Sequence, residues 1–142
     1  MKAITLTQPW ASLVALGEKK IETRGWTCYY TGPVAIHAAK TFRKREFADL
    51  THREPFYSAL RPGGEYCRPE DVVGHVIAIA RIVSCMSTSQ ARFVLDKKEL
   101  AFGNYADGRW AFKFADVQRI KPVKATGALG LWDWDAPYEV IL

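Results

Sequence analysis

The sequence predicts an α+β fold, a small mixed β-barrel with two or three flanking helices. Five or six segments either alternate apolar and polar residues or are rich in branched apolar residues, as strands are. The helical segments between them are short and irregularly spaced, and no glycine-rich phosphate loop is present, which argues against a doubly wound parallel sheet. Of the 142 residues, 49% are hydrophobic, so we expect residues 1–142 to form a single domain with a full core.

The first predicted elements are a strand and a helix. Residues 2–6 alternate as in a strand, and a helix begins at Pro9, whose missing N–H needs no partner at the first helical position. One apolar face at helical spacing follows, made of Trp10, Leu13, Val14 and Leu16. Gly17 stands where the chain must become left-handed to leave the helix.

A charged strand follows the glycine. Ile21 and Thr23 alternate with Lys20, Glu22 and Arg24, which is the period of a half-buried strand. Residues 26–31 are aromatic and are expected to be extended, with a turn at residues 31–33.

The later elements are assigned from composition and period. Helices are predicted on both sides of Pro55, the first capped by Thr41, and again at 90–95 and 97–102. A loop is predicted at 61–69. Three further strands are predicted at 34–38, 72–84 and 109–114, the second of them long and bent, and 117–123 is predicted to be a last pairing strand or a turn.

The composition limits the kinds of partner and the cell compartment that we expect for this protein. The net charge of +5 suits a polyanionic partner, although a charge of this size also serves solubility. Three scattered cysteines argue against disulfides, and neither they nor the histidines show metal-ligand spacing, so no metal and no cofactor are expected. The N-terminus does not resemble a signal peptide, and no apolar run reaches the ~20 residues that span a bilayer. We therefore expect a cytoplasmic, monomeric protein with no membrane association.

Three blocks of sequence carry a resemblance to a known family. Gly17, Lys19, Glu22 and Arg24 fit the pattern G-x-K-x-x-E-x-R. The segment 103–111, followed by Asp116-Val117, and the segment 127–134 complete the match. Together they resemble the ASCH domain family (activating signal cointegrator homology), which is related to the PUA RNA-binding domains. The resemblance implies a PUA-like barrel with a cleft that holds nucleic acid or a nucleotide.

The first block supplies the candidate catalytic residues, Lys19 and Glu22. A lysine beside a carboxylate can hold or move a proton, and the guanidinium of Arg24 can clamp a phosphate. On spacing alone the segment is better explained as an exposed strand edge with weak ion pairs, and it is the family resemblance that favours a functional cleft. In similar bacterial N-acetylcytidine amidohydrolases a threonine nucleophile stands where this chain has Glu22, so the resemblance does not carry that mechanism over. A glutamate there can instead act as a general base on water.

Other residues are candidates for contacts with nucleic acid. Trp10 and Tyr105 are expected to stack on bases, since Tyr105 lies in a loop; Trp132 and Trp134 are expected in the core. A change of Trp132 to alanine is therefore expected to cost more stability than the same change at Tyr105. The remaining candidates are Arg24, His37, Lys40 and Arg109, with the basic run 43–45 as a further phosphate contact.

Three functional hypotheses follow. The first is an ASCH-type module that binds RNA, with DNA as the alternative polymer, in a cleft around the G-x-K-x-x-E-x-R motif. The second is a hydrolase, a ribonuclease or a nucleoside amidohydrolase acting for example on acetylated cytidine, which uses Lys19 and Glu22. The third is a protein-interaction domain, for which no partner helix or tail is evident.

Overall fold

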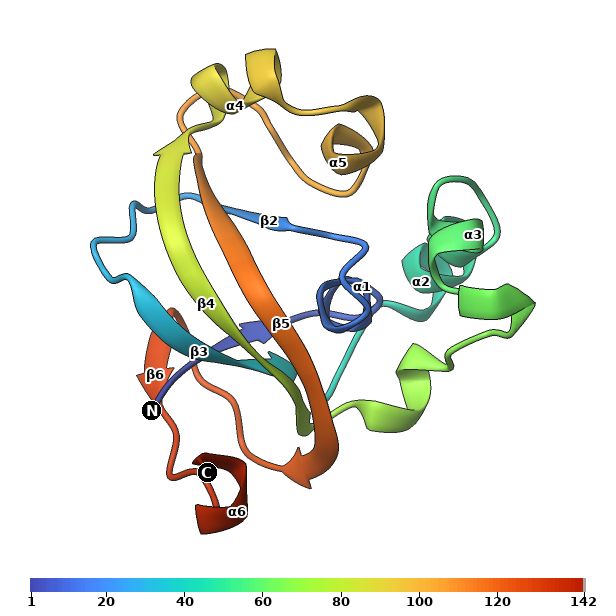
Figure 1. The fold of residues 1–142 in the computed structure, drawn as a ribbon. Coiled ribbons are helices and arrows are strands. Elements are labelled where there is room, and N and C mark those ends of the chain that lie inside the picture. The colour runs from blue at the N-terminus through green and yellow to red at the C-terminus, as the bar shows by residue number, and fades with distance from the viewer. Residues whose placement is uncertain (142) are drawn as a thin grey trace.

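The structure, a computed structural model, describes residues 1–141 and is built on one curled six-stranded sheet with helices around it (Figure 1). The strands are β1 (Lys2–Leu6), β2 (Ile21–Arg24), β3 (Gly32–Ala38), β4 (His75–Ser87), β5 (Trp110–Lys124) and β6 (Leu131–Asp133). The helices are α1 (Trp10–Ala15), α2 (Lys44–Thr51), α3 (Phe56–Ala59), α4 (Thr88–Val94), α5 (Lys97–Ala101) and α6 (Tyr138–Ile141). The predicted α+β class and small mixed barrel are confirmed, with more helices than expected.

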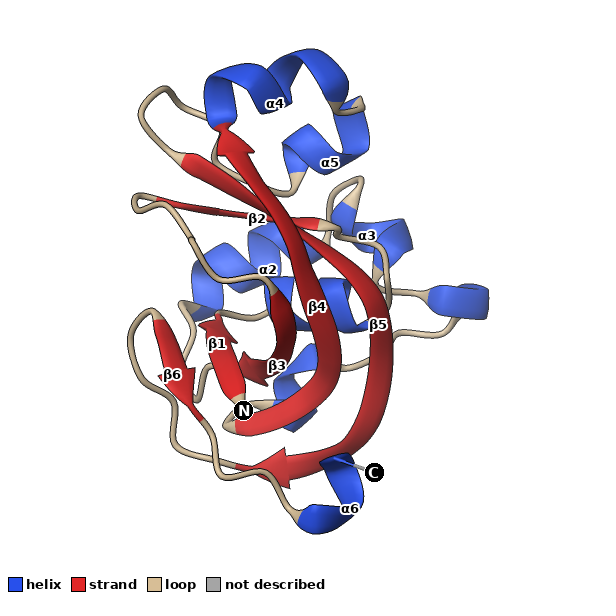
Figure 2. Ribbon diagram, turned by 60° about the vertical axis from the view of Figure 1, so that its left-hand side comes forward, coloured by secondary structure: helices blue, strands red, loops and turns tan. Residues whose placement is uncertain are grey.

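The sheet has the order β2-β5-β4-β3-β1-β6. Only the β1–β3 pair is parallel among these strands; the other pairs are antiparallel. The long strands β4 and β5 pair with three register shifts, and such bulges bend and twist a ladder. Their strong curvature gives the sheet the form of a half-barrel (Figure 2).

Several predicted boundaries differ from the structure. The segments 109–114 and 117–123, predicted as separate elements, belong to one strand, β5, which continues through Asp116 at a positive φ of 53°. Residues 26–31 form a loop rather than an extended strand, and Arg43 instead of Thr41 occupies the cap position of α2. The left-handed turn predicted at Gly17 is confirmed by its φ of 77°.

Helix α1 lies between the sheet and the helical layer formed by α2 and α3 (Figure 1). Its Val14 belongs to the main core, with the strand residues Leu6, Ile36, Ile82 and Phe112. On its other side Leu13 packs into a second cluster, with Leu50, Phe56, Leu60 and Phe102. Both faces of this short helix are therefore buried, which fixes the position of Trp10 at its start. Within residues 1–141 no helix combines the length and apolar character needed to cross a bilayer.

A chain of hydrogen bonds joins β6, β1, β3 and the end of β5. Trp132 Nε1 donates to Thr5 Oγ1 at 3.0 Å, and that hydroxyl lies 3.1 Å from His37 Nδ1. His37 Nε2 lies 2.8 Å from the carbonyl oxygen of Ala125. Because a carbonyl only accepts, Nε2 carries the proton and Nδ1 accepts from the Thr5 hydroxyl. His37 is thus a neutral, buried imidazole with both nitrogens satisfied.

Burial lowers the pKa of His37 below 6.5, with the Ala125 bond acting in the opposite direction. The unfolded chain then binds a proton at a pH where the folded chain does not, so the free energy of unfolding decreases as the pH falls below about 6.5. Urea unfolding between about pH 7.5 and pH 5.5 should show a smaller decrease for His37→Gln than for the wild type. His52→Gln, at an exposed histidine, is the control and should keep the wild-type slope. If the free energy of unfolding depended on pH equally in His37→Gln and in the wild type, His37 would not be the source of the stability lost at low pH.

Tyr105 lies in a loop, as predicted, but it is a core residue, and the prediction that its ring is available for stacking is wrong. It is 7% exposed and packs with Ile21, Ala91 and Ala111. Its ring lies so close to Gly103 that a Cβ on the glycine would be 2.9 Å from a ring carbon. Trp134 is buried as expected, whereas Trp132 is only half-buried. We therefore expect Tyr105→Ala to cost more stability than Trp132→Ala, which is the reverse of the order predicted from the sequence.

The Tyr105 hydroxyl has no hydrogen-bond partner among the described residues. Tyr105→Phe keeps the packing and removes that buried hydroxyl, so the free energy of unfolding should stay equal or rise by about 1 kcal/mol. Tyr105→Ala should lower it by about 3–5 kcal/mol, the usual cost of deleting a buried aromatic ring. Denaturant melts of the two variants measure both effects. A loss of stability in Tyr105→Phe comparable to that in Tyr105→Ala would mean that the hydroxyl, not the ring, is what matters.

Candidate functional site

A cleft of about 700 Å³ opens between the sheet and the helical layer. Its apolar wall comes from β1, the first three helices and the end of α5: Leu6, Trp10, Leu50, Phe56 and Phe102. Its polar wall comes from β1, α2, β2 and the loop before β5: Thr5, Thr7, Glu22, Thr23, Arg24, Glu46, Asn104 and Arg109. The cleft thus has one face suited to a flat apolar group and one that bears charges.

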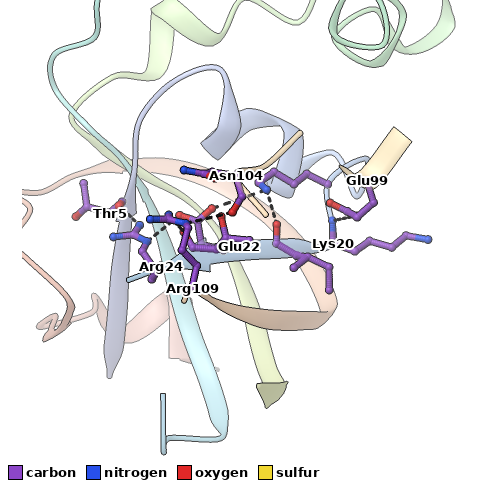
Figure 3. Close-up of polar contacts among 10 residues, drawn as sticks. Thr5, Lys20, Glu22, Arg24, Glu99, Asn104 and Arg109 are labelled. Carbon is purple, nitrogen blue, oxygen red and sulfur yellow. Dashed lines mark hydrogen bonds and ion pairs between the residues drawn. The ribbon is translucent and has the colours of Figure 1, made fainter. Parts of the chain in front are cut away.

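Glu22 and Arg24 stand on the same face of β2, as their alternation predicted. Arg24 Nε donates to Glu22 Oε2 at 2.8 Å, and Arg24 Nη2 donates to the carbonyl oxygen of Thr5 at 2.8 Å (Figure 3). The Glu22 side chain is 14% exposed and that of Arg24 is 23% exposed. The pair is therefore held in place, with part of each group facing the cleft.

Arg109 is held in a similar way from the loop before β5. Its Nε donates to the carbonyl oxygen of Asn104 at 3.1 Å and its Nη2 to that of Thr23 at 3.0 Å. Two of the five guanidinium N–H groups are used, as in Arg24, and the others have no partner among residues 1–141. Both guanidinium groups are thus fixed in position and retain donors for a ligand.

Lys19 does not line the cleft but lies behind it, at 1% side-chain exposure. Its ammonium group donates to the carbonyl oxygen of Ile21 and lies 3.8 Å from Glu22 Oε1. Burial lowers the pKa of Lys19, while the carboxylates of Glu22 and Glu99 act in the opposite direction. Each oxygen of Glu22 therefore faces a cation, Lys19 from within and Arg24 from the cleft side.

Glu99, at the base of α5, is the second carboxylate near Lys19. Its Oε1 accepts the backbone N–H of Lys20 at 2.7 Å, which attaches α5 to the start of β2 (Figure 3). Burial raises the pKa of Glu99, while the backbone N–H of Lys20 and the positive charge of Lys19 act in the opposite direction. Its other oxygen has no hydrogen-bond partner among the described residues. Behind the cleft, Lys19 therefore lies near two carboxylates, Glu22 from β2 and the buried Glu99 from α5.

The structure brings together some of the predicted site residues and separates others. Trp10, Glu22, Arg24 and Arg109 line the cleft. Lys40 and His37 line a neighbouring cavity, where both ring nitrogens of His37 are already bonded. Of the basic run, Arg43 alone lines an adjoining hollow of about 390 Å³, which shares Trp10 with the cleft.

Sequence reasoning missed Asn104, Glu46 and Glu99. Asn104 precedes Tyr105 in the block 103–111, of whose two predicted site residues Arg109 lines the cleft and Tyr105 does not. Glu46 lies among basic residues and could be read only as a solvated helix face. Nothing in the spacing of Glu99 indicates that it contacts the turn before β2, because the two are 79 residues apart. Among the described residues, no group of three His, Cys, Asp or Glu side chains is placed to hold a metal ion.

Comparisons with known proteins identify the family. The family model for the ASCH domain matches residues 4–124. The crystal structure of ASCH from Zymomonas mobilis is similar in fold, with a TM-score of 0.55 at 16% identity, over 99% of this chain and 90% of that one. Two single-substitution mutants of the Zymomonas protein align with TM-scores of 0.49, at 16% and 18% identity, over 87% of this chain and 74% and 72% of theirs. No curated protein matches. Since the family model spans most of the sequence, this chain belongs to the ASCH domain family.

Proposed function

We propose that the cleft binds a nucleotide of single-stranded RNA. The observation that carries the proposal is the pair of fixed guanidinium groups, Arg24 and Arg109, beside the Glu22 carboxylate in one cleft. Membership of a family related to RNA-binding domains supports it. Groups already held by the protein lose little freedom when a ligand binds, so they select a ligand of matching geometry.

The two walls of the cleft suit the two parts of a nucleotide. On the apolar wall Trp10 is half-buried and packs edge-on against Phe56, with the ring centroids 6.3 Å apart. An aromatic ring held in this way can stack on a base. Glu22 can accept from the amino group of a base such as cytosine, and the remaining arginine donors can reach sugar or phosphate oxygens.

A second candidate function is hydrolysis, favoured by the contact between Lys19 and Glu22. Burial lowers the pKa of Lys19, so that it gives up its proton more readily. Glu22, which lies 3.8 Å from the Lys19 ammonium group, lines the cleft. Glu22 would be the general base acting on water, and Lys19 a positioning residue that acts through it. Binding ranks first because Glu22 is engaged by two cations and Lys19 cannot itself touch a ligand in the cleft.

Salt dependence tests the binding proposal. Affinity for a single-stranded RNA oligonucleotide should fall steeply with salt, and Arg24→Gln should reduce the log–log slope by about 0.7, the value for one phosphate contact on a single strand. Arg81→Gln makes the same charge change at an exposed position of β4 outside the cleft and should leave the slope nearly unchanged. Fluorescence anisotropy at several salt concentrations measures both. Affinity independent of salt, or no affinity for any oligonucleotide, would refute the proposal.

Glu22→Gln separates the binder from the hydrolase. The amide keeps the shape of the side chain but removes the base, so an enzyme should lose about 100- to 10,000-fold in turnover. A pure binder should show no turnover in either form, and its affinity for RNA should change little, because the amide oxygen still accepts from a base amino group while the repulsion of phosphate is removed. Wild type and variant are assayed on acetylated cytidine and on a mixed RNA oligonucleotide. Hydrolysis that persists unchanged in Glu22→Gln would remove Glu22 from the catalytic role.

A further inference from the structure

A second cavity, of about 910 Å³, lies where β3 ends, β4 begins and β5 ends. The three segments are joined by backbone bonds: Gly74 N–H donates to the Ala38 carbonyl at 2.9 Å, and Ala125 N–H donates to the Gly74 carbonyl at 3.1 Å. The basic side chains that line the cavity are Lys40, His75 and Lys124, together with His37, whose two ring nitrogens are already bonded. We call this cavity the lysine pocket.

The charges of the lysine pocket have one sign. Lys40 and Lys124 are exposed and form no ion pair with any residue of the described chain, and no carboxylate from residues 1–141 lines the cavity. His75 donates from Nδ1 to the Val73 carbonyl at 2.9 Å, so in the neutral ring Nε2 is an acceptor, and the positive charge of the pocket comes from the two lysines. Cations gathered in a hollow without a counter-charge create a local positive potential, which favours an anion.

The lysine pocket is next to the cleft, separated by the loop 125–129. Both cavities are lined by Thr5, Ala128 and Leu129. The loop lies close against the sheet, because a Cβ on Gly127 would be 2.6 Å from Thr5 Oγ1 and 2.8 Å from His37 Nδ1. Leu129 is 97% exposed beside both cavities. A chain molecule that leaves the cleft across this loop therefore enters the lysine pocket.

We propose that the lysine pocket binds a phosphate group of the same RNA strand whose neighbouring nucleotide occupies the cleft. The strand crosses the loop 125–129 beside Leu129, and Lys40 and Lys124 neutralise its backbone on the far side. This strand path rests on the proposed function of the cleft, but the capacity of the pocket for phosphate does not. The two parts can therefore be tested separately.

The first experiment uses inorganic pyrophosphate, which has phosphate but no base. In a titration followed by NMR, the amide signals of Gly74 and His75 should shift in the wild type and in Arg24→Gln. They should not shift in the double variant Lys40→Gln/Lys124→Gln. The double variant Lys97→Gln/Lys113→Gln, which removes the same charge at exposed positions outside both cavities, should respond like the wild type. No shift in the wild type, or equal shifts in all variants, would refute the proposal that the lysine pocket binds phosphate.

The second experiment uses a ten-nucleotide RNA and a mononucleotide. Lys40→Gln/Lys124→Gln should weaken binding of the longer RNA on the order of tenfold and reduce the salt slope by about 1.4, the value for two contacts. Binding of the mononucleotide in the cleft should not change, and the Lys97/Lys113 variant should match the wild type. Undiminished binding of the longer RNA by the Lys40/Lys124 variant would overturn the strand path. Pyrophosphate binding without any RNA binding would refute the function of the cleft and leave only a phosphate site.

Discussion

Thr5 is the point on which both the closure of the half-barrel and the geometry of the cleft depend. Its hydroxyl accepts from Trp132 and donates to His37, which joins three strands of the sheet, and His37 continues the chain to Ala125. Its backbone carbonyl accepts from Arg24 and so orients the guanidinium in the cleft. Because one residue of β1 does both, a change in how the sheet closes also moves a ligand-facing charge. The same strand lines both cavities, so the site cannot be adjusted independently of the fold.

The burial of Lys19 is the second constraint. An ammonium group taken out of water is costly unless a counter-charge and acceptors surround it. Here the Ile21 carbonyl, Glu22 and Glu99 provide them, from the strand that follows and from α5. Glu22 compensates this buried cation and at the same time lines the cleft, so a residue that no ligand touches helps to set the charge of the site. The spacing of Lys19 and Glu22 in the sequence thus serves the stability of the fold as well as the cleft.

The sequence was most informative where the interactions are local. The helix after Pro9, the left-handed exit at Gly17 and the alternation of Ile21 to Arg24 are set by neighbours a few residues apart, and all three are found in the structure. The single apolar face predicted for that helix is not, because α1 is buried on both faces. The burial of Tyr105 and the contact of Glu99 with Lys20 depend on how α5 and the loop after it pack against β2. No periodicity encodes such packing, which is why a loop tyrosine was mistaken for a surface residue and a helix glutamate was overlooked.

The distribution of charge in and around the cleft indicates which part of a nucleotide each region binds. Two arginines and two glutamates line it, so its charge is nearly balanced, and both arginines are already bonded to the protein. A bare phosphate beside Glu22 gains little, since the carboxylate repels it, whereas a base with an amino group can donate to that same carboxylate while the arginine donors reach the phosphate of the same nucleotide. Cations that form no ion pair within residues 1–141 lie outside the cleft, among them Arg43 in the adjoining hollow and the two lysines of the lysine pocket. In nucleic-acid recognition phosphate contacts position the strand and base contacts specify it. The cleft then selects the base, and the basic residues around it orient the strand.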